Sequence, residues 1–180
     1  MQSVQRVAVV GSGGAGKSTF SRELGRLVEL PVIHLDHHYW RPGWIPTPSD
    51  LWRQKVAELA VEDRWVIDGN YGGSLDIRLQ RADTVIILAF SRWRCMSRVL
   101  RRWWTYRGRA VQADGCPERV DWQFLRWVWR YPVDARPRLD NALRAAGDSV
   151  AVIELTSPAA AAAFLHGLTN PTRPQRSSGR

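Results

Sequence analysis

Residues 7–19, Val-Ala-Val-Val-Gly-Ser-Gly-Gly-Ala-Gly-Lys-Ser-Thr, are the stretch from which the rest of the chain is interpreted. Gly11, Gly16, Lys17 and Ser18 complete the pattern G-x-x-x-x-G-K-[ST]. A β-branched apolar run precedes this pattern, and a segment with helically spaced apolar residues follows it. A glycine-rich turn alone would explain neither Lys17 nor Ser18, so the stretch predicts a phosphate-binding loop between a strand and a helix.

The physical basis of this prediction is the backbone of the loop. Glycines allow close approach to a ligand, successive N–H groups form an anion-binding nest, and the helix adds the positive end of its dipole. Lys17 is expected to reach the β- and γ-phosphates of ATP, and the Ser18 hydroxyl to bind Mg²⁺. The predicted nucleotide-binding residues are Gly11, Ser12, Gly13, Gly14, Ala15, Gly16, Lys17, Ser18 and Thr19.

The composition is that of a globular chain with a core. Its 180 residues are 44% apolar and 24% charged, and we expect one domain over residues 1–168, followed by a disordered basic tail over 169–180. Apolar runs are too short for a membrane span, and the first strand leaves no room for a signal peptide. Cys95 and Cys116 do not make a disulfide framework, so we expect a cytoplasmic protein without membrane partners.

Strand-like and helix-like segments alternate along the chain. We expect strands at 6–10, 31–35, 64–67, 84–90 and 149–155, and helices at 18–28, 50–62, 75–81, 92–106, 121–131, 134–146 and 158–168. Prolines at 42, 46 and 48 indicate irregular structure between the second strand and the second helix. The predicted fold class is therefore α/β, a three-layer P-loop NTPase fold around a five-stranded parallel sheet.

Two aspartates are expected at the carboxyl ends of strands, where ligands bind in such sheets. Asp68 is predicted to hold Mg²⁺ opposite Ser18, the alternative being a carboxylate that only caps a strand end. Asp36 is predicted to take a proton from an acceptor hydroxyl or to orient the acceptor, the alternative being helix capping. Asp83 precedes a strand and is expected to be structural.

Histidines surround Asp36. His34 is expected to share one strand face with Asp36, whereas His37 and His38 diverge in extended chain, which disfavours a transition-metal site. We interpret the group as a polar wall of an acceptor pocket, closed by Tyr39, Trp40 and Trp44.

The basic residues are unevenly placed. The net charge is +9, and residues 92–130 hold ten arginines against three acids together with six of the ten tryptophans. Arg94, Arg98 and Arg102 fall on roughly one helix face, which indicates either a solvated surface or a clamp on nucleotide phosphates. The tryptophans fit the packing of a lid helix better than a base-stacking platform.

These features together resemble the adenylate-kinase-like branch of P-loop kinases. The insertion at 36–62 resembles the acceptor-binding region, Asp68-Gly69 the Asp-Gly after the third strand, and residues 103–130 the Arg-rich lid. The resemblance implies that Arg98 and Arg102 hold ATP and act in catalysis with Lys17 and Asp36.

More closely, the chain is similar to the group called DNA topology modulation proteins. The similarity covers about residues 4–157, and the matching stretches are 34–36, 40–44, 65–71, 98–100, 106–108, 115–118 and 121–122. It implies ATP binding on a nucleotide-kinase fold.

Elements of the AMP site of true adenylate kinases are missing, so the acceptor stays open. The Thr-Gly…Arg element is absent from 36–62, Asn70-Tyr71 follow Asp68-Gly69, and Arg78 is the candidate for the missing arginine. The lid, with one cysteine and no histidine, has too few ligands for a four-ligand zinc site. The predicted acceptor-binding residues are His34, Asp36, Trp40, Arg41, Asn70 and Arg78.

The sequence thus favours a kinase that transfers the γ-phosphoryl group of ATP, with Mg²⁺, to a nucleotide or another small-molecule acceptor. Two alternatives remain at this point. One is a nucleic-acid-associated ATP-binding protein that affects DNA topology, and the other is a non-catalytic nucleotide sensor.

Overall fold

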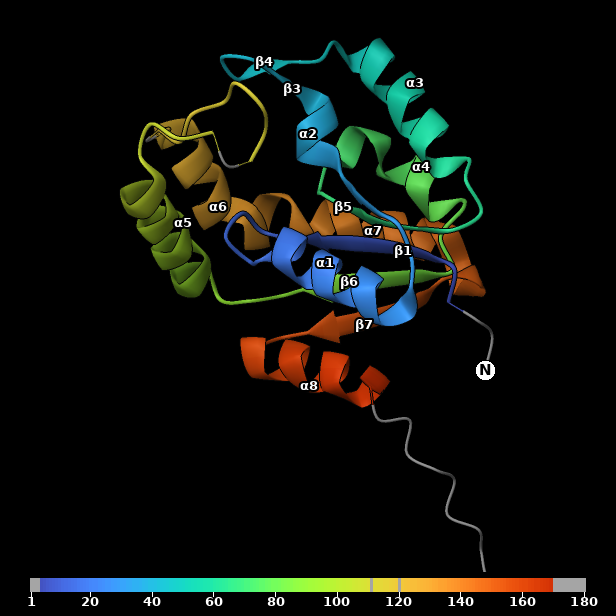
Figure 1. Cartoon of the computed structure of the whole chain (residues 1–180). Coiled ribbons are helices and arrows are strands. Elements are labelled where there is room, and N and C mark those ends of the chain that lie inside the picture. The colour runs from blue at the N-terminus through green and yellow to red at the C-terminus, as the bar shows by residue number, and fades with distance from the viewer. Residues whose placement is uncertain (1–3, 111, 120, 170–180) are drawn as a thin grey trace, which may run out of the picture.

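A five-stranded parallel sheet forms the centre of the computed structural model, which describes residues 4–110, 112–119 and 121–169. The strand order is β2–β5–β1–β6–β7 (Figure 1). The strands are β1 (Arg6–Gly11), β2 (Val32–His34), β5 (Trp65–Asp68), β6 (Thr84–Leu88) and β7 (Ala151–Leu155). The predicted five-stranded parallel sheet is confirmed. Residues 170–180 of the expected tail lie outside the described residues.

Helices cover both faces of this sheet (Figure 1). They are α1 (Lys17–Val28), α2 (Leu35–Tyr39), α3 (Ser49–Ala60), α4 (Leu75–Leu79), α5 (Arg92–Tyr106), α6 (Trp122–Asp134), α7 (Arg136–Ala146) and α8 (Pro158–Thr169). Short 3₁₀ turns precede α4 and β7, at Gly72–Ser74 and Gly147–Ser149. The predicted three-layer α/β architecture is therefore confirmed.

Alternation along β1 divides the core into two halves. Val7 and Val9 belong to a buried cluster with Phe20 and Leu24 of α1, against which α8 also packs. Their neighbours Ala8 and Val10 belong to a second cluster, which residues of α3, α4 and α7 complete. Successive side chains of a strand point to opposite faces, so one short strand anchors both helical layers.

The segment after β2 differs from the expectation. The strand ends at His34, and Leu35–Tyr39 form a helical turn, so Asp36 is helical and does not share a strand face with His34. His37 and His38 lie in the same helical turn.

The proline-rich stretch that follows is also more regular than expected. It forms a small antiparallel hairpin, β3 (Trp40–Arg41) with β4 (Ile45–Pro46). The prolines are tolerated because Pro46 sits in a two-residue edge strand and Pro42 at the turn, where no ladder donor is needed. Thr47 secures the base of the hairpin, since both its N–H and its hydroxyl donate to the Tyr39 carbonyl.

Helix α6 is longer than its sequence pattern indicates. It continues to Asp134, through Pro132, where an end at residue 131 was expected. The chain nevertheless remains helical, and the Ala135 amide bonds the Tyr131 carbonyl at 3.1 Å. Within the described ranges, no helix has both the length and the apolar character needed to cross a membrane.

Candidate active site

The glycine-rich loop connects β1 to α1 and is fixed by its own lysine. Lys17 Nζ donates to the carbonyls of Gly11 at 3.0 Å and Ser12 at 3.1 Å. Burial lowers the pKa of Lys17, whereas the carboxylates of Asp36 and Asp68 act in the opposite direction. Lys17 therefore lies within electrostatic reach of two carboxylates, Asp68 at the end of β5 and Asp36 in α2.

Helices α5 and α6 pack directly on this loop, which is why it contains glycine. A Cβ at Gly14 would lie 2.3 Å from the Cys95 carbonyl oxygen, and Gly14 has a φ of +77°. A Cβ at Gly13 would lie 2.7 Å from the Phe124 ring. Close packing of α5 and α6 thus constrains the backbone shape of the loop.

Ser18 and Asp68, the two predicted Mg²⁺ ligands, lie together in the structure. Ser18 Oγ donates to Asp68 Oδ1 at 3.4 Å, and the carboxylate is only 2% exposed. Asp68 ends β5, directly beside β1, and the parallel register brings it to the edge where α1 begins. A buried carboxylate facing a hydroxyl is an oxygen donor set suited to Mg²⁺.

His34, which the sequence predicts in the wall of an acceptor pocket, contacts this same cluster. It pairs in register with Asp68 across β2 and β5, and its Nδ1 lies 2.5 Å from Asp68 Oδ2. The imidazole therefore orients the second oxygen of the carboxylate. Among the described residues, no group of three or more His, Cys, Asp or Glu side chains is arranged to hold a metal ion by itself.

Asp36 lies nearby but is held by a residue that the sequence reasoning missed. The Tyr71 hydroxyl donates to Asp36 Oδ1 at 2.5 Å, and the Tyr71 ring packs against Tyr39 and Trp52. Burial, with the adjacent Asp36 charge, raises the pKa of the Tyr71 hydroxyl, so it remains a donor. The available signal was its position, three residues after Asp68.

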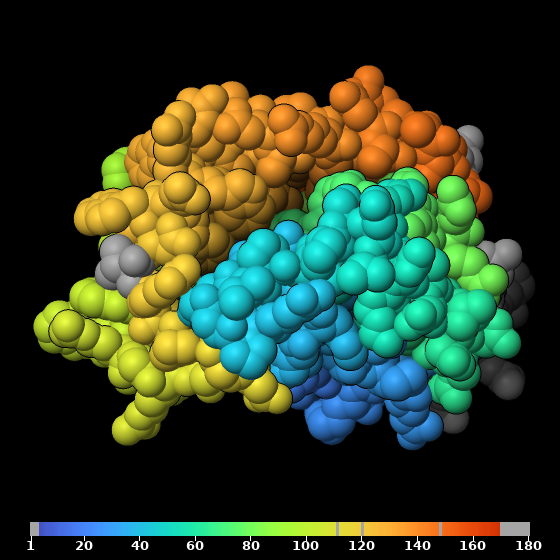
Figure 2. Space-filling model, turned by 90° about the horizontal axis from the view of Figure 1, so that it is seen from above, coloured from blue at the N-terminus to red at the C-terminus, as the bar shows by residue number. Residues whose placement is uncertain are grey.

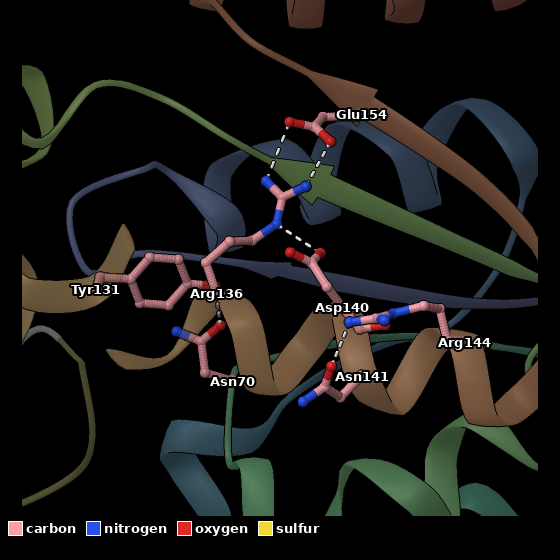
Figure 3. A network of polar contacts seen from close by, with 7 residues as sticks. All are labelled: Asn70, Tyr131, Arg136, Asp140, Asn141, Arg144 and Glu154. Atoms are coloured by element: carbon pink, nitrogen blue, oxygen red, sulfur yellow. Dashed lines mark hydrogen bonds and ion pairs between the residues drawn. The ribbon is translucent and has the colours of Figure 1, made fainter. Parts of the chain in front are cut away.

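Asn70 was expected to contact an acceptor, and the structure places it on the phosphate-binding loop. Its side-chain amide bonds the Gly11 backbone twice, accepting from N–H at 3.0 Å and donating to the carbonyl at 2.5 Å. The Tyr131 hydroxyl donates to the same amide oxygen at 3.4 Å, as Figure 3 shows. Asn70 is thus a link between the loop, β5 and α6.

Arg78 also differs from the expectation. Its side chain is fully buried, and it donates to the carbonyls of Gly69 at 2.8 Å and Asn70 at 2.5 Å. Burial lowers the pKa of Arg78 to about 10. Its two terminal nitrogens hold the segment that carries Asn70 and Tyr71, which gives Arg78 a positioning role where the sequence predicted acceptor binding.

The arginines of α5 separate into two groups. Arg98 Nη1 donates to the Ala15 carbonyl at 3.3 Å, which places this guanidinium over the phosphate-binding loop. Arg102 of α5 instead pairs with the buried Glu118 of the lid, Nε to Oε1 at 3.0 Å. Arg94 and Arg98 line a groove that also contains Ser91, Trp93, Ser97 and Arg101. Of the expected row of Arg94, Arg98 and Arg102, the first two line this groove, and Arg102 is paired with Glu118.

Trp40 and Arg41 lie in the hairpin beyond Asp36. Trp40 packs edge-on against Tyr39 and Trp44, with ring centroids 4.8 and 5.4 Å apart. The Arg41 side chain is exposed, and its carbonyl accepts a hydrogen bond from the Cys116 thiol of the lid. Trp40 thus belongs to a group of packed aromatic rings near Asp36. Arg41 contacts the lid through its backbone carbonyl.

Several solved structures with a similar fold are kinases. No protein-family model matches the sequence, and no curated protein matches it either. The chain is similar to a shikimate kinase from Acinetobacter baumannii in complex with shikimate, at TM-score 0.56 and 19% identity, over 94% of this chain and 93% of that one. It is also similar to a gluconokinase from Sinorhizobium meliloti 1021, at TM-score 0.53 and 15% identity, over 96% and 100%.

A shikimate kinase from Bacteroides thetaiotaomicron gives a TM-score of 0.51 at 16% identity, over 93% of this chain and 98% of that one. Each likeness therefore extends over nearly the whole of both chains. The chain has the fold of the P-loop kinases.

Proposed function

We propose that this protein is a kinase that transfers the γ-phosphoryl group of Mg·ATP to a hydroxyl group of a small-molecule acceptor. The observation that carries the proposal is the meeting of three groups at one sheet edge. Lys17 lies within the field of both Asp36 and Asp68, and Ser18 bonds Asp68 directly. Phosphoryl transfer needs a phosphate cradle, a metal site and a polar group for the acceptor, and each has a candidate here.

The nucleotide side consists of residues 11–19 and Arg98. Backbone N–H groups and the start of α1 would bind the phosphates, with Lys17 moving from the loop carbonyls to the β- and γ-phosphates. Arg98 lies where it can neutralise phosphate charge from above the loop. Mg²⁺ bound by Ser18 and Asp68 would supply further neutralisation of the phosphates.

The acceptor side is built around Asp36. Its carboxylate would accept the proton of the attacking hydroxyl or orient that hydroxyl, while Tyr71 holds the carboxylate in place. Tyr39 and Trp40 supply an aromatic wall beside it. The resemblance to the adenylate-kinase-like branch and to the DNA topology modulation group supports the nucleotide side and leaves the acceptor to experiment.

The test is an acceptor screen with radiolabelled Mg·ATP. The panel contains nucleotides, nucleosides, small alcohols, shikimate and gluconate, because the structural neighbours include kinases named for the last two. Labelled product from at least one compound is the expected result. If ATP turnover never rises above water hydrolysis with any compound, the kinase proposal is wrong.

A nucleic-acid-associated function is a second candidate, and one surface favours it. Helix α5 exposes Trp93 at 71% and Trp104 at 77%, and residues 91–113 contain seven arginines and no acid. Exposed aromatic and cationic side chains suit stacked bases and phosphates. This function predicts binding to DNA whose log K falls steeply with log salt, measured by fluorescence anisotropy. No measurable binding at low salt would rule it out.

A further inference from the structure

The two sides of the proposed active site differ in the charge of their side chains. Arg98 lies over the phosphate-binding loop, and Arg94 and Arg101 line the groove beside it. On the acceptor side, the charged group nearest in role to the reaction is a carboxylate, Asp36, which lies within electrostatic reach of Lys17. The nucleotide side is thus suited to an anion, and the acceptor side to a ligand of different charge.

The cationic side chains of the acceptor side are already engaged, with one exception. Among residues 31–81, all of which the structure describes, every lysine and arginine side chain except Arg41 has a hydrogen-bond partner. The pairs are Arg53 with Asp76, Lys55 with Glu58, Arg64 with the Glu29 carbonyl, Arg78 with the carbonyls of Gly69 and Asn70, and Arg81 with the Val61 carbonyl. Arg41 is exposed on the hairpin. A carboxylate or phosphate on the acceptor would therefore meet little positive charge from this segment.

Aromatic rings pack together beside Asp36. Tyr71 bonds Asp36, and its ring centroid lies 4.6 Å from that of Tyr39, which lies 4.8 Å from that of Trp40. The ring planes are inclined at 49° in the first pair and 85° in the second. All three residues are half-buried, so part of each stays accessible. Inclined rings offer no parallel slot for a planar base, whereas an organic cation is attracted to the faces of such rings.

Helix α6 carries a second aromatic group on the other side of a hollow. Figure 2 shows this hollow between residues 36–62 (cyan) and helices α6 and α7 (orange). Trp127 packs edge-on against Tyr131, with ring centroids 5.4 Å apart, and remains 36% exposed. Tyr131 in turn donates to Asn70, the neighbour of Tyr71. Both elements that border the hollow therefore present aromatic residues.

We propose that the acceptor is an amino alcohol, a small hydroxyl compound that carries a protonated amine at neutral pH. This acceptor class rests on the proposed kinase function and narrows it. The ammonium group would lie against the rings of Tyr39 and Trp40, within the field of the Asp36 carboxylate. An acceptor with a carboxylate or a phosphate would instead meet the like charges of Asp36 and of the ATP phosphates, which disfavour its binding.

The amine serves recognition and takes no part in the bond changes. The acceptor oxygen forms a bond to the γ-phosphorus of ATP as the bond from that phosphorus to the bridging oxygen of ADP breaks. The electron pair of the broken bond leaves with ADP. The hydroxyl proton passes to Asp36 and from there to solvent.

Binding of charge-matched ligands tests the acceptor class without reference to catalysis. Aminobutanol, butanediol and hydroxybutyrate share one carbon skeleton and differ in charge, and so do aminomethyl-, methyl- and carboxybenzyl alcohol. Isothermal titration calorimetry measures their dissociation constants in the presence of Mg²⁺ and a non-hydrolysable ATP analogue. In at least one series, the amine should bind more tightly than the carboxylate by at least about tenfold. Equal constants in both series, binding by none of the ligands, or tighter binding of the carboxylates would overturn the proposal.

Paired variants show whether this preference arises at the site. Asp36→Asn removes the charge and keeps the shape of the side chain, so it should abolish the preference for the amine. Asp50→Asn, at an exposed position of α3, is its control and should keep the preference. Trp40→Leu should weaken amine binding, Trp40→Phe should restore part of it, and Trp104→Leu, at a ring of α5 that is 77% exposed, should leave it unchanged. A preference that survives both Asp36→Asn and Trp40→Leu would overturn the proposed site.

Arg41→Met addresses the one cation of the segment without a partner. The proposal gives Arg41 no part in binding, so the preference for the amine should be unchanged in this variant. Tight binding of hydroxybutyrate that is lost in Arg41→Met would show that the site holds an anion, and would overturn the proposal.

Turnover tests the same class. Radiolabelled Mg·ATP is offered with both ligand series and with shikimate and gluconate, which are carboxylates. Label is expected on the amino alcohols in preference to the uncharged and anionic compounds. Label confined to carboxylates or nucleotides would overturn the acceptor class and leave the kinase function standing. Absence of label on every compound overturns the kinase function, while the dissociation constants still decide whether the site prefers a cation.

Discussion

At the scale of single residues, the site depends on charges that are buried or held by specific partners. Asp68 has Ser18 on one oxygen and His34 on the other. Asp36 has Tyr71, and Arg78 has two backbone carbonyls. The glycine-rich loop was predictable because the spacing of its glycines, lysine and serine is a pattern in the sequence. The partners of Asp36 and Arg78 were not, because they depend on burial and on helix geometry that no local pattern specifies.

Lys17→Ala is expected to lower the rate of phosphoryl transfer by on the order of 10²–10³, since it removes a positioned cation from the transferring phosphates. The rate is measured with the acceptor found in the screen. Lys55→Ala is the control, because Lys55 is the only other lysine and lies on α3 in a surface pair with Glu58. Near-normal turnover after loss of Lys17 would show that the loop is not the catalytic centre.

Arg78→Met is expected to lower the free energy of unfolding by about 2–4 kcal/mol, because two buried carbonyls lose their donors. Urea unfolding monitored by circular dichroism measures it. The exposed Arg22 of α1 provides the control, Arg22→Met, which should change stability by less than about 0.5 kcal/mol. Equal stabilities of the two variants would contradict the role given to Arg78.

At the scale of elements, helix termini and turns place the site residues. Strand ends were predictable from apolar runs, and β5 ends at Asp68 as expected. The two-residue strands of the hairpin were not predictable, because the contacts that hold Trp44 and Gly43 come from residues more than 70 positions further along the chain. The local structural signals around residue 43 are its prolines and glycine, which by themselves indicate an irregular loop.

Helix α6 offers a prediction at this scale. Asp121 caps it, since its carboxylate accepts from the N–H groups of Gln123 and Phe124 at 2.9 and 3.2 Å. Asp121→Ala should therefore lower the free energy of unfolding by about 1 kcal/mol. The exposed Asp114 of the lid loop gives the control Asp114→Ala, with little expected change. A thermal or urea titration that finds no difference between the two would refute the capping role.

At the scale of the whole molecule, arginine ion pairs tie the outer helices to their neighbours. Arg136 of α7 donates to both Asp140 on its own helix and Glu154 of β7, the edge strand, as drawn in Figure 3. Arg53 of α3 makes a comparable paired contact with Asp76 of α4. Some of the many arginines thus join neighbouring helices and strands, in addition to those in the proposed nucleotide site.

Acid pH should weaken the Arg136–Glu154 pair. The hydrogen bond from Arg136 lowers the pKa of Glu154 below its ordinary 4.5, so folding favours the ionised carboxylate. Its contribution is complete above about pH 4.5 and is lost as the pH falls through the lowered pKa. Glu154→Gln should cost about 0.5–1 kcal/mol of unfolding free energy at neutral pH, because the pair is partly exposed.

Urea unfolding at about pH 7 and at a series of lower pH values measures this change, and the difference between wild type and Glu154→Gln should shrink as the pH falls through the lowered pKa of Glu154. Glu62→Gln, at an exposed position, is the control. A difference that persists unchanged at low pH would show that ionisation of Glu154 is not its cause.

The pair of hydrogen bonds between the Asn70 side chain and the Gly11 backbone has a thermodynamic consequence. Asn70 is fixed to the nucleotide loop, and its immediate neighbour Tyr71 is fixed to Asp36 on the acceptor side. Two adjacent residues therefore connect the donor half of the site to the acceptor half. A shift of Gly11 on filling the loop would reach Asp36 through the hydrogen bonds of Asn70, the Asn70–Tyr71 peptide bond and the hydrogen bond of Tyr71. The two substrates are thus expected to bind with linked affinities, each altering the dissociation constant of the other by the same factor.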